Sequence, residues 1–504
     1  MQPSPVNGPA TDEAVVAVSA LHDAIKSGSA ECVRALMRRG VDINARSSIT
    51  GVTPLLVAAS AGSDEAVALL VECGADVSAA ARKNGMTALH MAAAHGSAAM
   101  VTLLMQHGAD VNAVDAAGCT PLHAAASCSS RAAAAEALLS NPASNANVAA
   151  HNGMTALHVA AAHGISAGTL QLLLLHGADI HAADQHGLTP LHTAVIAGRH
   201  STAQQLLDLG ADVDALDAVG WSALYAAVIK GRHDMVALLL ARGADANASA
   251  GEGWTALHAA AAAGRQSIVA LLLDHGANAS AQNSQGKTAM HAAVFSAAAS
   301  SMLGLLLRRG ADASTADEDG CTALHLAVNS GDHATVQLLL SAGAPVGAMD
   351  RHGFSPLRLA VLRGEQEHSI VLLQLLLLAQ EQQHGGDFFV AWPALADALE
   401  LAAAHERWHM CAALLRAALW GSASSSSSAG GRRSVQLVAD SILGQWAQAT
   451  RQHGQGLEQQ RAQLEQEWAE LRAARARLTV ERTAVQHLVV QAAGLMVEQQ
   501  QRAA

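Results

Sequence analysis

One phrase, Gly-x-Thr-[Ala/Pro]-Leu-His, returns along this chain every 33 to 35 residues. Close copies begin at Gly85, Gly118, Gly153, Gly187, Gly253, Gly286 and Gly320, and looser copies begin at Gly51, Gly220 and Gly353. With Leu21 and His22 one period before the first of these, eleven units can be recognised. A fixed period of this length indicates a stacked repeat protein, in which single units bury too little apolar surface to be stable alone.

Each unit predicts two short antiparallel helices. The first begins after Thr87, a favourable N-cap residue, and stops at Gly96. Residues 98–106 then carry apolar side chains at helical spacing and end before Gly108. Residues 110–118 are small, polar and turn-forming, so they predict an extended loop or hairpin that leads to the next unit. The sequence therefore predicts an all-α solenoid of about 11 to 12 helix-turn-helix units with hairpin fingers.

The repeated motifs resemble those of the ankyrin-repeat family over about residues 17–380. Thr-Pro-Leu-His-x-Ala-Ala, a Gly in the middle of the repeat and Leu-Leu-x-x-Gly-Ala-Asp recur in register. The resemblance implies L-shaped units whose hairpins project like fingers and whose inner helices line a concave face where partner proteins bind. It also implies that the repeated histidine hydrogen-bonds locally and supports the start of the helix, rather than binding metal. Eight of the 26 histidines occupy this position: His22, His90, His123, His158, His192, His258, His291 and His325.

Composition and charge narrow the class of protein further. Aromatic content of 2% beside 51% hydrophobic residues predicts a core of Ala and Leu, which favours close helix stacking over a compact enzyme fold. A net charge of −12 without a basic block argues against nucleic acid or anionic membranes as main partners. The six cysteines show no metal-ligand spacing, so we expect no disulfides and no cofactor.

The expected location is the cytoplasm, with the nucleus left open. The N-terminal residues have neither a basic start nor an apolar core, so they do not resemble a secretory signal. The most apolar run, residues 370–379, is about half of the ~20 residues that a membrane-spanning helix needs.

The residue after each repeat-opening Gly is the candidate contact with a partner protein, because in ankyrin proteins that position lies near the hairpin tip and faces the groove. Trp221 and Trp254 fall in consecutive repeats, so we expect them about 10 Å apart on one surface. Paired exposed Trp residues are typical of a binding hot spot. The alternative is that they only cover the neighbouring hairpins. The candidate partner-binding residues are Met86, Met154, Leu188, Trp221, Trp254, Lys287 and Phe354.

A modification site is also indicated. The stretch from Leu104 to Asn112 ends in Asp-Val-Asn and is similar to the ankyrin sites of asparaginyl hydroxylases. Asn112 is therefore a candidate for hydroxylation.

One motif has the spacing of a zinc protease site. Residues 405–409 read His-Glu-Arg-Trp-His, and this pattern binds zinc only when both His lie on one helical face and a third ligand is present. Alignment with the repeat at Leu326 places Glu406 at the turn between two helices, so His405 and His409 should diverge. No phosphate loop, dinucleotide-binding loop, nucleophile elbow or kinase signature occurs elsewhere. The leading hypothesis is a non-enzymatic scaffold or adaptor. The alternative is a regulatory subunit or enzyme remnant with a zinc site at His405 and His409.

The C-terminal part predicts a separate helical module. The expected organisation is a disordered leader (1–16), the solenoid (17–420) with a degenerate last unit (about 390–420), a Ser/Gly-rich linker (421–434) and a helical segment (435–504). Within that segment a seven-residue spacing predicts a coiled coil over about residues 457–501, with core positions at Leu457, Leu464, Leu471, Leu478 and Val485. Arg475 and Arg482 at the companion position suit a weak homodimer, or docking on a different protein, better than a tight zipper. A solvated single helix remains a third interpretation.

Overall fold

The computed structural model describes residues 12–47 and 51–362, together with scattered positions between 371 and 414. The chain divides into two compact units, of which the first runs to Gly251 and includes Asp274–Gly276, and the second takes the remaining residues. Helices joined by turns and hairpins form both units, and the described residues contain no β-strand beyond isolated antiparallel bridges. The predicted all-helical repeat class is therefore confirmed for this part of the chain.

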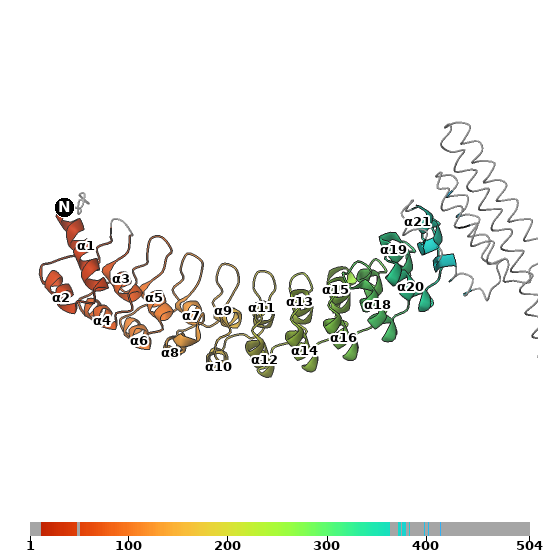
Figure 1. Ribbon diagram of the computed structural model, residues 1–504. Helices are drawn as coiled ribbons and strands as arrows, with labels where there is room; N and C mark the ends of the chain where they lie inside the picture. The colour runs from red at the N-terminus through yellow and green to blue at the C-terminus, as the bar shows by residue number, and fades with distance from the viewer. Residues whose placement is uncertain are drawn as a thin grey trace, which may run out of the picture. The chain divides into compact units, whose positions relative to one another are not determined.

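The first unit contains seven helix pairs in its described residues. We call the first helix of each pair the inner helix and the second the outer helix. The inner helices are α1 (Asp12–Lys26), α3 (Pro54–Ser60), α5 (Ala88–His95), α7 (Pro121–Ala125), α9 (Ala156–His163), α11 (Pro190–Ala197) and α13 (Ala223–Lys230). The outer helices are α2 (Ala30–Arg38), α4 (Asp64–Glu72), α6 (Ala98–Gln106), α8 (Ala132–Leu139), α10 (Ala167–Leu175), α12 (His200–Asp208) and α14 (His233–Ala241). A 3₁₀ turn, η1 (Ser129–Arg131), precedes α8. Figure 1 shows the inner helices of this unit in one layer, the outer helices in a second, and the hairpins projecting past the inner layer.

The second unit repeats the same plan. Its inner helices are α15 (Ala256–Ala262), α17 (Ala289–Ala293), α19 (Ala323–Ser330) and α21 (Pro356–Leu362). Its outer helices are α16 (Gln266–Asp274), α18 (Ala299–Arg308) and α20 (His333–Ser341), and a 3₁₀ turn, η2 (Gly251–Gly253), precedes α15. The last residue of α16 is grouped with the first unit.

Most inner helices begin and end where the repeated phrase predicts, whereas α7 and α17 end without a terminating glycine. In α5, Thr87 is the N-cap, and its backbone N–H and side chain are both satisfied in a capping box with His90. The helix ends at Gly96, whose φ of 83° lies in the left-handed region that favours glycine. A Pro occupies the start of α3, α7 and α11, where its missing N–H costs no helical hydrogen bond.

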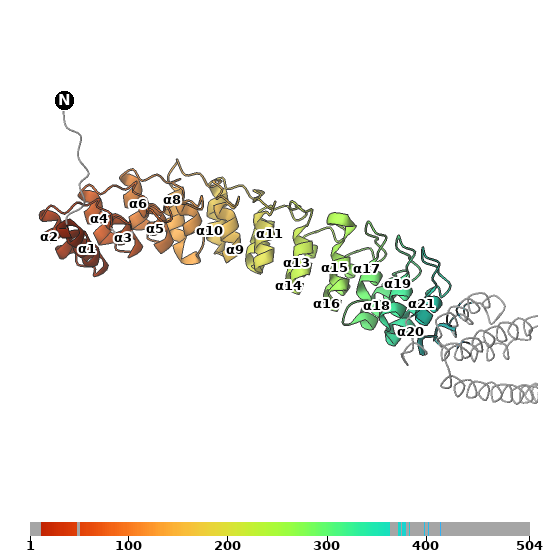
Figure 2. The same cartoon turned by 90° about the horizontal axis from the view of Figure 1, so that it is seen from above.

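Packing between repeats stabilises these helices, because five to eight residues are too few for a helix to persist alone in water. Within each unit, each inner helix packs on the next inner helix, as α9 does on α11, and the outer helices α4, α6 and α8 pack in the same way. Leu157 and Leu191 in these contacts are fully buried. Burying such a side chain contributes about 2 kcal/mol. From above, the helix pairs of the first unit follow one another in chain order (Figure 2).

The structure moves the start of the helical region. Helix α1 begins at Asp12, inside the segment 1–16 that the sequence assigned to a disordered leader.

Candidate functional site

The candidate contact residues share one place in the fold. Each lies on the arm of the hairpin that leads into an inner helix, directly before the N-cap residue rather than at the hairpin tip. Trp221 shows the local geometry, because its N–H donates to Asp217 Oδ1 at 2.8 Å and its carbonyl accepts from the Asp217 N–H at 2.9 Å. Leu188 forms the same pair of bonds with Asp184. We call this the hairpin-arm position, and its residues are Val52, Met86, Cys119, Met154, Leu188, Trp221, Trp254, Lys287, Cys321 and Phe354.

The repeated histidines hold the hairpin arms from the preceding repeat. In His192, Nδ1 accepts from the Thr189 N–H at 3.3 Å, and Nε2 lies 3.1 Å from the carbonyl oxygen of Trp221. Since a backbone N–H can only donate and a carbonyl can only accept, the proton sits on Nε2. Seven histidines make both contacts and form what we call the histidine ladder: His90, His123, His158, His192, His258, His291 and His325. The local role implied by the family resemblance is confirmed, and the structure adds a bond to the next repeat.

The environment of the histidine ladder keeps the rings neutral. Burial lowers the pKa of each of its members, of which His158 is fully buried. A second proton on Nδ1 would also face the N–H of the N-cap Thr, so protonation removes the bond that starts the helix. Among the described residues, no group of three or more His, Cys, Asp or Glu is arranged to hold a metal ion.

Three aromatic hairpin-arm residues pack on the side chain four residues further on. The Trp221 ring lies 5.2 Å from the Tyr225 ring at an angle of 46°. Within the second unit, the Trp254 ring lies 5.5 Å from the ring of His258 in an edge-on arrangement, and the Arg358 guanidinium lies 5.1 Å from the centre of the Phe354 ring. These contacts fix the rings in place while part of each surface stays accessible, and 37% of Trp221 is exposed. Trp221 belongs to the first unit and Trp254 to the second, so the expected distance between them remains a prediction.

In the first unit the hairpin arms form an apolar row. Met86, Met154 and Leu188 are all partly exposed, as Trp221 is. Met154 lacks an Asp at the usual position, and its N–H donates instead to Asn152 Oδ1 at 3.0 Å. Hairpins with different tip sequences thus each provide a side-chain oxygen that accepts the N–H of the hairpin-arm residue.

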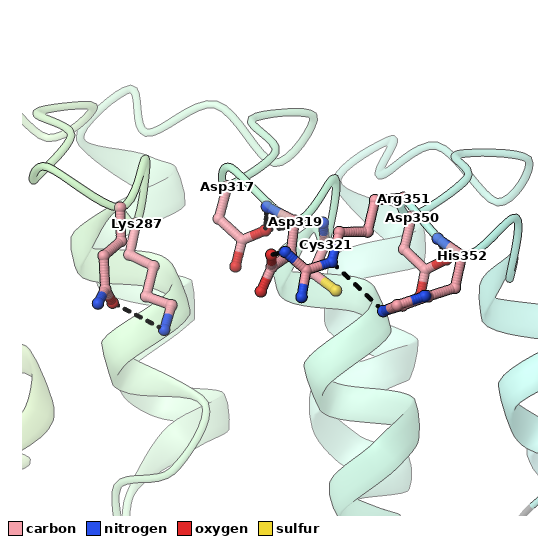
Figure 3. Close-up of polar contacts among 8 residues, drawn as sticks. Lys287, Asp317, Asp319, Cys321, Asp350, Arg351 and His352 are labelled. Carbon is pink, nitrogen blue, oxygen red and sulfur yellow. Dashed lines mark hydrogen bonds and ion pairs between the residues drawn. The ribbon is translucent and has the colours of Figure 1, made fainter.

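In the second unit the hairpins are more polar (Figure 3). The Lys287 ammonium donates to Gln285 Oε1 at 3.1 Å, so it lies along its own hairpin. In the next two hairpins Arg351 forms an ion pair with Asp319 and lies 3.3 Å from the ring nitrogen of His352. The carboxylates near Cys321 add to burial in raising the pKa of its thiol.

A basic edge lies where the inner helices of the first unit end. Arg199 Nε donates to the carbonyl of Ala162 at 3.0 Å, and Arg232 Nη2 donates to the carbonyl of Ile196 at 3.1 Å. Each guanidinium therefore binds the C-terminal end of the inner helix in the preceding repeat, where the helix dipole is negative. Lys230, the last residue of α13, is exposed at the corresponding end of the next inner helix.

Sequence reasoning missed the residues around Trp221 that complete an apolar surface. Tyr225 is the only tyrosine of the chain, and it replaces the repeated histidine. Trp221, Tyr225 and Ile229 follow each other at intervals of four residues, which is the spacing of one helix face and is visible in the sequence. Leu216 and Val219 on the same hairpin are exposed.

The candidate hydroxylation site is part of a structural contact. The Asn112 side-chain amide donates to the carbonyl of Ala143 at 2.7 Å, and its Oδ1 accepts from the Asn145 N–H at 2.9 Å. Asn147 repeats this arrangement one unit later, with bonds to Gly177 and Asp179. A hydroxylase would have to open the contact with the following loop in order to reach Asn112.

Two predicted sites lie outside the described residues. These are the zinc motif at His405 and His409, and the heptad positions Leu457, Leu464, Leu471, Leu478 and Val485. Throughout the described part of the chain, every helix is too short or too polar to cross a membrane.

Comparison with known families agrees with the geometry. The family model for ankyrin repeats, which describes three copies at a time, matches residues 21–115, 78–150, 112–184, 157–250, 243–317 and 295–382. A search of curated proteins finds no match. The matched stretches together run from residue 21 to residue 382 and carry the same capped inner helices and hairpins, so the chain belongs to the ankyrin-repeat family.

Proposed function

We propose that this chain is a non-enzymatic scaffold or adaptor that binds a partner protein on its hairpin arms and inner helices. Ankyrin repeats are generally protein–protein interaction modules. The observation that carries the proposal is the way each hairpin arm is held. The backbone of Trp221 takes part in bonds to Asp217 and to His192 of the preceding repeat, while its side chain remains partly exposed. Side chains fixed before binding lose little conformational entropy when a partner docks.

The apolar row of the first unit supports this role. Met154, Leu188 and Trp221 present partly exposed apolar groups at the same place in three successive repeats. A partner that contacts several repeats can bury these side chains together, and buried aromatic anchors contribute most of the binding energy in many interfaces.

A capture experiment tests the proposal. The full chain serves as bait beside a variant carrying Met154→Ser, Leu188→Ser and Trp221→Ser. Leu175→Ser is the matched control, because Leu175 is 82% exposed on the outer helix α10. The expected result is a specific set of captured proteins that the triple variant loses and the control keeps, while both variants retain the circular dichroism of the original chain. Equal capture by all three baits would reject the hairpin arms as the binding surface.

We further propose that the C-terminal segment multimerises the scaffold or recruits a second protein. The support is the seven-residue spacing from Leu457 to Val485. Weak pairing through this segment would raise the avidity of two tethered solenoids for a bivalent partner.

The alternative role, an enzyme remnant or regulatory subunit, is supported only by the His-Glu-x-x-His pattern at His405 and His409. Purified protein should contain no stoichiometric zinc and should keep its melting temperature in a chelator. Zinc at one equivalent that is lost in His405→Ala would favour the alternative.

A further inference from the structure

Exposed apolar side chains in the first unit are concentrated in one repeat. Eight large hydrophobic side chains of the described residues in this unit are strongly exposed, and four of them lie between residues 216 and 229. They are Leu216 (55% exposed), Val219 (64%), Trp221 (37%) and Ile229 (42%). Leaving this much apolar surface in water within a short stretch of chain is typical of an interaction site.

The exposed side chains lie on the hairpin and on helix α13. Trp221 stacks on Tyr225, which is itself buried, and Ile229 lies one helical turn beyond Tyr225. The buried Tyr225 ring thus supports Trp221 from below. In this repeat Tyr225 occupies the place of the histidine used in most repeats, and it packs on Trp221 of its own hairpin arm.

The charge bordering these side chains at the end of α13 is positive, because Lys230 is exposed next to Ile229. The guanidinium groups of Arg232 and Arg199 lie at the ends of α11 and α9, one and two repeats earlier. The acidic groups nearby in sequence are engaged or lie on the other layer. Asp217 accepts the N–H groups of Val219 and Trp221, and Asp234, which opens the outer helix α14, pairs with His233 at 3.6 Å.

We propose that this surface, consisting of Leu216, Val219, Trp221, Ile229 and Lys230, with Trp221 supported by the buried Tyr225, binds an acidic, apolar-anchored segment of a partner protein. We call it the α13 surface. Helix α13 has 8 residues, and at 1.5 Å per residue it is about 12 Å long. An extended peptide covers that length with about four residues. The occupant therefore places an aromatic or aliphatic side chain against Trp221 and an Asp or Glu about four residues away, near Lys230. This inference rests on the proposed binding function and adds the chemistry of the partner.

Selection from a random library tests this chemistry without a known partner. The full chain is immobilised and used to select dodecapeptides displayed on phage, and selected peptides are then synthesised and titrated by fluorescence polarisation. We expect enrichment of an apolar or aromatic residue with an acidic residue about four positions away. Trp221→Ala should weaken binding of these peptides at least 10-fold. Lys230→Glu should weaken binding of the same peptides to a similar extent. When the selection is repeated with this variant, the enriched peptides should carry Lys or Arg in place of the acidic residue.

Two controls separate this specificity from general effects. Leu175→Ala removes an exposed apolar side chain from the outer layer, and Lys26→Glu reverses an exposed charge at the end of α1, so neither should change affinity. Enrichment of peptides that contain no acidic residue would overturn the inference. Peptides whose affinity is unchanged by Trp221→Ala would overturn it as well. If the triple variant still loses captured proteins in that case, the proposed function stands and only the α13 surface is rejected.

The chain also contains its own acidic and apolar stretch, with Glu465, Glu467, Trp468 and Glu470. A second full-length protein with these three Glu residues changed to Gln therefore goes through the same selection. Peptides that bind only to this protein would show that the α13 surface is occupied by the chain itself, which would overturn the assignment to a partner.

Discussion

The histidine ladder gives the sharpest test of how adjacent repeats are held together, and His158 is its best-placed member. It is fully buried in α9. Its Nδ1 accepts from the Thr155 N–H at 3.1 Å, and its Nε2 donates to the Leu188 carbonyl at 2.9 Å. His158→Ala removes both bonds and leaves the volume of an imidazole empty.

The expected loss can be worked out bond by bond. The buried Thr155 N–H would lose its partner, which costs about 1–3 kcal/mol. The Leu188 carbonyl keeps its bond from the Asp184 N–H, so losing the second donor costs only about 1 kcal/mol. The empty volume adds about 1 kcal/mol or more. We expect His158→Ala to lower the free energy of unfolding by about 3–5 kcal/mol.

His158→Asn separates the two bonds, because an Asn Oδ1 can accept from Thr155 as Nδ1 does but cannot reach the next repeat. We expect it to cost roughly half as much as His158→Ala. The matched control is His163→Ala, since His163 is exposed on the same helix and should change stability by less than about 0.5 kcal/mol.

Hydrogen exchange measured by mass spectrometry is the suitable assay, because it reports opening of single repeats in a long solenoid. At pH 7.5, His158→Ala should speed exchange in α9 and α11 by about 100-fold or more. A change no larger than that of His163→Ala would refute the account, and equal effects of Ala and Asn would show that the bond to Leu188 dominates.

Four further predictions follow from the structure and the sequence. Burial lowers the native pKa of the histidines in the ladder below the unfolded value of ~6.5, so the native state binds fewer protons than the unfolded state. The stability that these histidines contribute is therefore fully present above pH ~6.5 and decreases as the pH falls below it. Urea midpoints that stay constant from pH 7.5 to pH 5 would contradict this. Gly198→Ala should cost about 1–3 kcal/mol, because φ is +73° there and a Cβ would overlap the Arg232 guanidinium, and Arg232→Ala in the same chain should recover part of the loss. In analytical ultracentrifugation the full chain should dimerise with a dissociation constant on the order of micromolar. The double variant Leu464→Lys with Leu471→Lys should be a monomer. A full chain that stays monomeric at high concentration would instead indicate that the C-terminal segment docks on another protein. Mass spectrometry of protein from cells that contain an asparaginyl hydroxylase should find oxygen added at Asn112, and an unmodified residue would count against that site.

The repeat architecture could be read from the sequence because its determinants are local and recur. Thr87, the capping residue, and Gly96, the terminator, act within a few residues of their own helix, and the period repeats them in register. The recurrent position of the candidate contact residues was found in the same way, but the sequence placed it near the hairpin tip and the structure places it on the arm. The start of α1 was also not found, because residues 12–16 lie outside the repeated pattern.

What the arm residues contact could not be read from the sequence. The repeated histidine predicts a helix start, but its bond to the next repeat depends on how closely two inner helices stack. Trp221 is an aromatic residue at a recurrent place in the sequence, whereas its packing on Tyr225 and its remaining exposure appear only in the folded chain.

Thus the sequence alone determined the repeat length, most of the inner-helix boundaries and the family of this protein, because these follow from capping chemistry and hydrophobic periodicity within each unit. Only the tertiary structure decided which groups join one repeat to the next. Arg199 reaches the carbonyl of Ala162, 37 residues away, and His192 reaches that of Trp221, 29 residues away. Such contacts depend on the distance and direction between stacked helices, which side-chain packing sets and no local pattern encodes.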